Sequence, residues 1–300
     1  MSSNINKLVL SILEDDDLKK YDVLFTPRRI SDRTERELIR ILNVLKKEEC
    51  NGDLDFSVIV DAGLANSITS LGNLRVVHGN VILTRSKITS LGKLERIDGD
   101  LVIYDSQIRD LGNLEYIGRN FKADESKLTS FGKLKFIGSS ISVEDTPMKT
   151  LGNNFKEFGY NFVKDKRLKY DSFSLMISRS DISSLGSVER IKGDFYAERT
   201  KLVDLYPLRE VDGLVDLDYC QELTTLEPLE VVKGNLSLRG TPNLTDISSL
   251  RLVKGEIFIS DDSKVDRDKL SELRSLRSKV SRRYTDQGNK LDIGYKFFEY

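Results

Sequence analysis

Apolar and polar residues follow a pattern that repeats every twenty residues. It is clearest in the successive segments ITSLGNLRVVHGNVILTRSK (68–87) and ITSLGKLERIDGDLVIYDSQ (88–107). In each repeat, apolar residues first occur at every third position, over a segment that we call the arm. They then occur at every second position. The interval of two predicts a short β-strand, because successive side chains of a strand point to opposite faces. One repeat cannot bury so many apolar residues, so the pattern predicts a solenoid of stacked coils.

The columns of this repeat define the expected core. The arm contributes three apolar columns, which begin at Leu71, Leu74 and Val77 in the first repeat. The strand contributes two inward positions per coil. These pairs are Val81 and Leu83, Leu101 and Ile103, Phe121 and Ala123, Ile141 and Val143, Leu175 and Ile177, Phe195 and Ala197, Val215 and Leu217, Leu236 and Leu238, and Ile257 and Ile259. We therefore expect a repeat solenoid, β-rich with some α-helix, of about nine coils of 20–21 residues with a parallel sheet.

Glycine and hydroxyl residues form further columns. Glycines such as Gly72 and Gly79 predict sharp turns, and two later coils place Tyr206 and Glu227 at the first of these positions, each followed by proline. The hydroxyl column consists of Ser86, Ser106, Ser126, Thr146, Ser180, Thr200, Cys220 and Thr241. A row of hydroxyls can be read as nucleophiles or as a hydrogen-bonded ladder. We favour a ladder that satisfies backbone groups of neighbouring coils, because no general base recurs beside it.

The two ends of the chain differ from the repeats. We divide the chain into an N-terminal helical cap (1–56), the solenoid (57–262) and a C-terminal helical cap with an aromatic tail (263–300). Open solenoid ends expose apolar core and unpaired strand edges, so caps are expected there.

Amphipathic helices are predicted over residues 3–14 and about 33–48, the second starting at Ser31 or Asp32. The predicted buried stripe of the second helix consists of Leu38, Ile39, Leu42 and Leu45. The predicted C-terminal helix starts near Ser263 or Asp266, and its stripe consists of Leu270, Leu273, Leu276 and Val280.

The array is interrupted once. Leu151 and Leu185 are 34 residues apart, where neighbouring coils use 20, and residues 153–174 form an irregular insertion. Insertions in solenoids become loops on one face and often carry binding. The alternative is a degenerate coil with a bulge, and both readings stay open.

The pattern LxxLxxLxxIxGxLxI, with a strand after each glycine, resembles leucine-rich-repeat-like solenoids of the receptor L-domain type. It is also similar to repeat proteins of unassigned function in bacteria and large tailed phages. The resemblance covers roughly residues 57–262 and implies a right-handed stack with a parallel sheet and a binding role. Hydroxyl residues stand where the common leucine-rich repeat has Asn or Cys. The resemblance implies no catalytic residue and no particular ligand.

Composition narrows the functional classes. The 47 Lys and Arg residues nearly balance the 48 Asp and Glu residues, and basic and acidic residues are mixed along the arms. We therefore do not expect nucleic-acid binding, which favours a continuous positive stripe. No apolar run approaches a membrane span, and the two cysteines lie in different regions. We expect a cytoplasmic protein, or a virion-associated one if it is encoded by a phage.

Catalytic, cofactor and metal motifs are not expected. His78 is the only histidine, and a His-based metal site needs more than one. The outward strand positions include Asp124 and Glu144 on adjacent coils, which suggests a carbohydrate-active enzyme as a third hypothesis. We expect these carboxylates to stay solvated on an open sheet, so we predict that the protein is not an enzyme.

The outward positions better suit an interaction face, because aromatic side chains framed by charges are typical of protein interfaces. The candidate partner-binding residues are Tyr104, Asp124, Glu144, Tyr196, Glu198, Asp218, Tyr219, Arg239, Tyr295, Phe297 and Phe298. The main hypothesis is a non-enzymatic, cytoplasmic protein-binding module or scaffold. It binds a protein partner with a basic patch through the sheet face, the insertion or the tail. The second hypothesis is a structural component of a larger assembly, such as a phage particle. A homo-oligomer is compatible with both.

Overall fold

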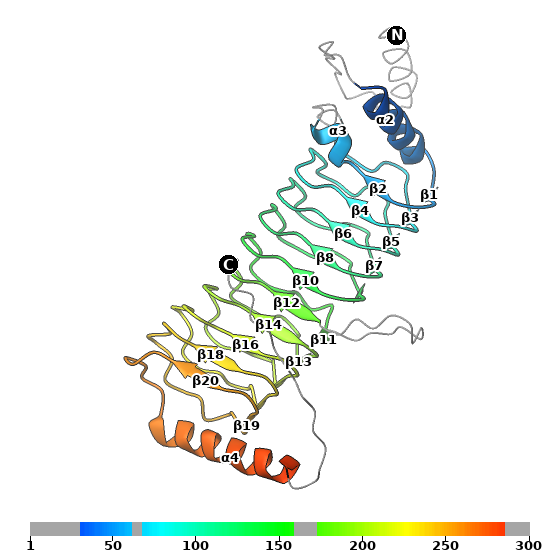
Figure 1. Cartoon of the computed structure of the whole chain (residues 1–300). Coiled ribbons are helices and arrows are strands. Elements are labelled where there is room, and N and C mark those ends of the chain that lie inside the picture. Colours follow the sequence, from blue (N-terminus) through cyan, green and yellow to red (C-terminus); the bar gives the residue numbers. More distant parts are fainter. Residues whose placement is uncertain (1–30, 62–67, 159–172, 286–300) are drawn as a thin grey trace.

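The computed structural model describes residues 31–61, 68–158 and 173–285, and it shows a parallel β-solenoid of stacked coils (Figure 1). One sheet of ten parallel strands runs along the stack, and we call it the front sheet. Its strands are β2 (Leu54–Asp55), β4 (Val81–Ile82), β6 (Leu101–Val102), β8 (Phe121–Lys122), β10 (Ile141–Ser142), β12 (Ser174–Met176), β14 (Asp194–Tyr196), β16 (Val215–Asp216), β18 (Leu236–Leu238) and β20 (Ile257–Ile259).

The arms also contain strands, which the sequence analysis did not predict. The first arm sheet consists of β1 (Glu49–Cys50), β3 (Val76–Val77), β5 (Arg96–Ile97), β7 (Tyr116–Ile117) and β9 (Phe136–Ile137). The second arm sheet consists of β11 (Glu157–Phe158), β13 (Arg190–Ile191), β15 (Glu210–Val211), β17 (Val231–Val232) and β19 (Leu252–Val253). The predicted parallel sheet is the front sheet, and the two arm sheets were missed, because a two-residue strand is too short to show an alternation of its own.

The predicted strand columns are confirmed by the register of the front sheet. Val81 pairs with Leu101, and Ile141 pairs with Leu175 although 34 residues separate them. Fourteen of these inward side chains are fully buried, and the least buried is Ile259, which is only partly covered. Strands β1 and β2 pair with β3 and β4, so the stack begins at Glu49, inside the range assigned to the N-terminal cap.

One apolar column of the core was missed. It lies two or three residues after the hydroxyl column, and every member is fully buried. It consists of Ile88, Ile108, Leu128, Met148, Ile182, Leu202, Leu223 and Leu244. This column could have been predicted from the sequence, since all eight coils have an apolar residue there.

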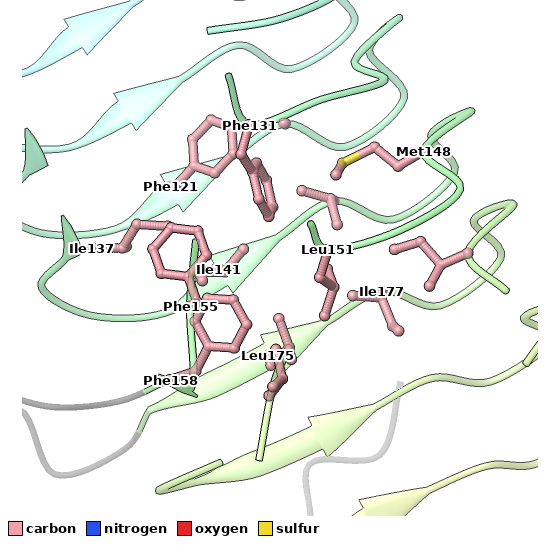
Figure 2. Packing of buried hydrophobic residues seen from close by; sticks show 14 of the residues in the cluster. Phe121, Phe131, Ile137, Ile141, Met148, Leu151, Phe155, Phe158, Leu175 and Ile177 are labelled. Carbon is pink, nitrogen blue, oxygen red and sulfur yellow. The ribbon is translucent and has the colours of Figure 1, made fainter. Parts of the chain in front are cut away.

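The core is rich in phenylalanine where the spacing of the repeats changes (Figure 2). The ring of Phe131 lies edge-on to Phe121 and Phe155, with both centroid distances at 5.9 Å. Phe155 and Phe158 are buried, so residues 153–158 start the expected coil. However, β9 and β11 belong to different sheets, whereas β10 and β12 pair directly. We call this interruption the arm break. Residues 159–172 of the insertion, including Phe162, lie outside the described residues.

The hydroxyl column is buried, as expected, but its hydrogen bonds differ from the prediction. Thr146, Thr200 and Thr241 donate to the carbonyl three residues earlier in their own coil, at 2.7–2.9 Å. The expected bonds to neighbouring coils were therefore wrong for these residues. Cys220 does reach the neighbouring coil, because its Sγ donates to the Ala197 carbonyl at 3.1 Å.

Besides the front sheet and the arm sheets, the coils have a third side, which contains the glycine corner that follows the hydroxyl column. On this side, the glycine corners of neighbouring coils approach one another in pairs. Isolated parallel bridges join Ser70 to Ser90 and Thr150 to Ser184 on this side. A Cβ placed on Gly186, next to the second bridge, would overlap the carbonyl oxygen of Gly152, far inside the 3.0 Å that real Cβ contacts respect. A Cβ on Gly152 itself would meet nothing within 4 Å. The coils are therefore close within a bridged pair and further apart between pairs.

Helices lie at the two ends of the stack (Figure 1). Helix α2 (Asp32–Leu45) starts where the Ser31 hydroxyl accepts the Thr34 N–H at 3.2 Å. It buries Leu38 and Ile41, so the predicted stripe was wrong in choosing Ile39, which is only partly covered.

Two further helices complete the described structure. The short helix α3 (Ser57–Asp61) contacts α2. Helix α4 (Arg267–Thr285) starts where Asp266 accepts the Asp268 N–H at 2.8 Å. It buries Leu270 and Leu273 and contacts β19. The predicted helix 3–14 lies outside the described residues, as does the side chain of Val280.

Candidate functional site

The candidate site is the outer face, which we define as the outward residues of the front sheet and the corner residue that follows each strand. Seven corner residues have positive φ values of 47–59° although none is glycine. They are Arg85, Asp105, Glu125, Asp145, Arg179, Arg199 and Tyr219. The same backbone shape therefore carries acidic, basic and aromatic side chains. As a result, the chemistry of this corner can change without a change in the scaffold.

The outer face is strongly acidic over three consecutive coils. In residues 101–105, 121–125 and 141–145 there are five acids and one base, a net charge of −4. The acids are Asp105, Asp124, Glu125, Glu144 and Asp145, and the base is Lys122. Asp105, Glu125 and Asp145 are exposed at the corner. Parallel strands hold successive coils about 4.8 Å apart, so these charges form a dense row.

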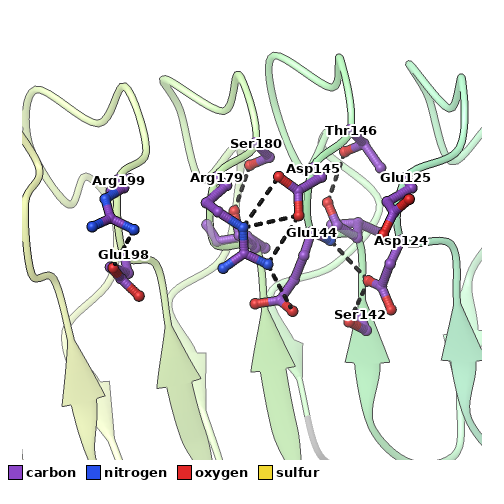
Figure 3. A network of polar contacts seen from close by, with 12 residues as sticks. Asp124, Glu125, Ser142, Glu144, Asp145, Thr146, Arg179, Ser180, Glu198 and Arg199 are labelled. Carbon is purple, nitrogen blue, oxygen red and sulfur yellow. Dashed lines mark hydrogen bonds and ion pairs between the residues drawn. The ribbon is translucent and has the colours of Figure 1, made fainter.

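Part of this acidic row is held in a polar network (Figure 3). The Asp124 carboxylate accepts the Ser142 hydroxyl and the backbone N–H of Glu144, the latter at 2.9 Å. The Arg179 guanidinium donates to both oxygens of Asp145, at 2.9 and 3.1 Å, and lies 3.7 Å from Glu144. Asp124 is therefore fixed in orientation by the coil that follows it.

Glu144 departs from the expectation of an ordinary, solvated carboxylate. Burial raises the pKa of Glu144, and the nearby charge of Asp124 raises it further, while Arg179 opposes the shift. The prediction that carboxylates on this open sheet stay solvated was wrong at this position. Only 25% of the Glu144 side chain is exposed, so it has lost part of its contact with water.

A second acidic group follows on later coils. Asp218 is only 8% exposed, and its carboxylate accepts the Ser237 hydroxyl at 2.6 Å and the Arg239 N–H at 2.8 Å. This arrangement repeats that of Asp124 with Ser142. Burial also raises the pKa of Asp216, with the charges of Asp218 and Glu198 adding to it. Asp218 therefore links two neighbouring coils, and most of this predicted partner-binding residue is covered.

The predicted aromatic residues differ in exposure. Tyr219 is 45% exposed, and the Arg199 guanidinium lies over its ring at 4.9 Å from the centroid. The Tyr104 hydroxyl donates to Glu125 at 2.9 Å, and this bond raises the pKa of Tyr104. Burial raises the pKa of Tyr196, which is partly covered.

The remaining predicted residues are distributed as follows. Arg239 is exposed and lies over the ring of Phe258 at 4.8 Å, and Glu198 pairs with Arg199 at 3.0 Å. The predicted residues of the tail, Tyr295, Phe297 and Phe298, lie outside the described residues. The choice of site residues omitted Asp105 and Glu125, although their place just before the hydroxyl column marks them as corner residues.

The chemistry available to metals and thiols is limited within the described ranges. No group of three or more His, Cys, Asp and Glu residues there could hold a metal ion. Both cysteines are free and buried, and burial raises the pKa of the thiols of Cys50 and Cys220. None of the helices among the described residues has the length and apolar character to cross a membrane.

Comparison with known proteins assigns no family to the chain. A scan against protein-family models, a search of curated proteins and a search of solved structures found no match. The class that is shown is therefore the parallel β-solenoid.

Proposed function

We propose that this protein is a non-enzymatic interaction module that binds a protein partner through the outer face. The observation that carries the proposal is the net charge of −4 on three consecutive coils, displayed at fixed spacing by a continuous ten-stranded sheet. A rigid row of like charges favours a complementary partner surface, because ordering it on binding costs little conformational entropy.

The partner that fits this face is a protein with a basic patch. Tyr219 and Arg239, both exposed on later coils, supply aromatic and cationic contacts of the kind that dominate interfaces. Because exposed charges contribute much of the attraction, binding weakens as the salt concentration rises.

The experiment uses the variant Asp105→Arg/Glu125→Arg. Arginine stands at the equivalent corner in Arg85, Arg179 and Arg199, so this backbone already accepts it. The matched control is Glu222→Arg/Glu227→Arg, which makes the same charge change at two exposed acids elsewhere.

Each protein is used to capture partners from a lysate of the native host, and the partners are quantified by mass spectrometry. We expect the wild type and the control to retain a basic partner that the corner variant loses. A partner retained equally by all three proteins would remove the outer face from consideration.

Our proposal also covers the role of the terminal helices and the cellular compartment of the protein. We propose that α2 and α4 act as caps, since each buries apolar side chains at an end of the stack. The likeness to leucine-rich-repeat proteins and a cytoplasmic location are further proposals, and the two free, buried cysteines are compatible with a reducing compartment.

A second candidate function is carbohydrate-active chemistry at Asp124 and Glu144. The observation that favours it is the raised pKa of Glu144 beside the fixed carboxylate of Asp124. Such a pair can divide the roles of acid and base. Screening the wild type and Glu144→Gln against acidic and neutral polysaccharides tests it, and hydrolysis that Glu144→Gln abolishes would support it.

A further inference from the structure

A row of basic residues lies on the third side of the coils, next to the outer face. Each of four successive coils contributes one exposed cation to this basic stripe, which consists of Lys87, Arg109, Lys127 and Lys149. Between the hydroxyl column and the glycine corner of these coils, residues 86–92, 106–112, 126–132 and 146–152 contain only one acid, Asp110. Four bases and one acid give a net charge of +3.

Three members of the basic stripe lack an ion-pair partner within the described part of the chain. Lys87, Arg109 and Lys127 form no ion pair there, whereas Lys149 lies 3.0 Å from Asp181. Their charges are therefore available to another molecule.

The basic stripe and the acidic row occupy the same coils on either side of one edge. In one coil, Glu125, Ser126 and Lys127 follow each other, with the buried serine at the edge between the two charges. Among the described residues, no ion pair joins the stripe to the acidic row. The molecule thus carries two rows of opposite charge on consecutive coils, and members of both rows, such as Lys127 and Asp105, form no ion pair within the described ranges.

We propose that the partner of the outer face is a second copy of this chain, with the basic stripe of each copy facing the acidic row of the other. This inference rests on the proposed function, because it uses the same outer face. A two-fold axis at the edge between the two rows places the basic stripe of each subunit against the acidic row of the other, because both subunits use the same patch. Both rows follow the stack over consecutive coils, so several coils of one copy can face several coils of the other.

A nucleic acid is the less favoured occupant of the basic stripe. Stacking of bases on aromatic side chains supports binding of single strands. The only aromatic residue in the four stripe segments is Phe131, which is 4% exposed. The adjacent acidic row would also repel phosphates.

The experiment measures self-association by sedimentation velocity over a range of protein concentrations, at about 50 mM and about 500 mM NaCl. The stripe variant is Lys87→Asp/Lys127→Asp, and Asp181 already occupies the equivalent position in a later coil. The face variant is Asp105→Arg/Glu125→Arg. The matched control is Lys46→Asp/Lys264→Asp, at two exposed lysines outside the stripe.

We expect the wild type and the control to form dimers that weaken with salt. Each of the two charge-reversal variants should dimerise at least about tenfold more weakly, because every reversed charge acts twice across a two-fold interface. An equimolar mixture of the two variants should associate again, because the reversed stripe of one variant then faces the reversed acidic row of the other, and the two unchanged rows face each other.

Three outcomes would overturn the self-association. A wild type that is monomeric at both salt concentrations is one, and variants that lose association separately without regaining it in the mixture are another. The third is binding of a single-stranded oligonucleotide by the wild type that the stripe variant loses. None of these three outcomes decides the proposed function, which is tested by capture of a basic partner from the lysate.

Discussion

Replacing Gly186 by alanine tests how closely the coils approach on the third side. The φ of Gly186 is +65°, and its Cβ would overlap the carbonyl oxygen of Gly152. Alanine at positive φ costs about 1 kcal/mol. Relief of the overlap must also separate the coils, which lengthens the bonds from Ser187 N to Gly152 O (3.1 Å) and from Leu151 N to Ser184 O (3.3 Å). Losing two such bonds costs about 2 kcal/mol, so the total is about 3 kcal/mol.

The control is Gly152→Ala, which isolates the contribution of close approach. Its φ is +75°, so it incurs the same backbone cost of about 1 kcal/mol, but its Cβ meets nothing within 4 Å. Urea denaturation followed by far-UV circular dichroism gives the free energy of unfolding of both variants. We expect Gly186→Ala to be less stable than Gly152→Ala by about 2 kcal/mol. Equal destabilisation of the two variants would refute the pairwise approach of the coils.

Three further predictions concern single side chains. The bond from His78 to Asp98 (2.8 Å) raises the pKa of His78 above its ordinary 6.5, so it stabilises the fold below pH 6.5 and ceases to do so as the pH rises through the raised value. His78→Gln should therefore have a lower free energy of unfolding than the wild type below pH 6.5, and the same free energy well above the raised pKa. A difference in free energy that does not change with pH would contradict this. Cys50 and Cys220 should resist a thiol reagent in the native protein and both react in urea, because they are buried; rapid native labelling would be the contrary result. Asp218→Ala should lower the free energy of unfolding by about 2 kcal/mol, because the carboxylate accepts two hydrogen bonds, and an unchanged urea midpoint would contradict it.

The periodic part of the fold could be predicted from the sequence because the columns are set by burial. Register follows directly from such columns, since a slip by one residue would turn every inward side chain outward. Val81 pairs with Leu101 and Phe121 pairs with Ile141 as the alternation predicts. The predicted register is also confirmed at Leu175, which follows a 34-residue interval.

The candidate site could be predicted only in outline. The strand pattern showed which residues point outward, but exposure depends on neighbours from other coils. Asp124 and Asp218 are held by serines 18 and 19 residues further on, and the alternation within one strand contains no information about that contact. The corner acids Asp105 and Glu125 are exposed at positive φ, a conformation that is uncommon for glutamate, so the pattern of strand residues alone did not single them out.

The pairing of β10 with β12 beside the arm break has a consequence for how this chain can vary in length. Ile141 and Leu175 stay side by side although the stretch between them has grown by 14 residues relative to a 20-residue coil, from 20 to 34. Extra segments can thus enter on the arm side while the outer surface keeps its spacing. A descendant of this protein could gain or lose loops there and still present the same pattern of charges.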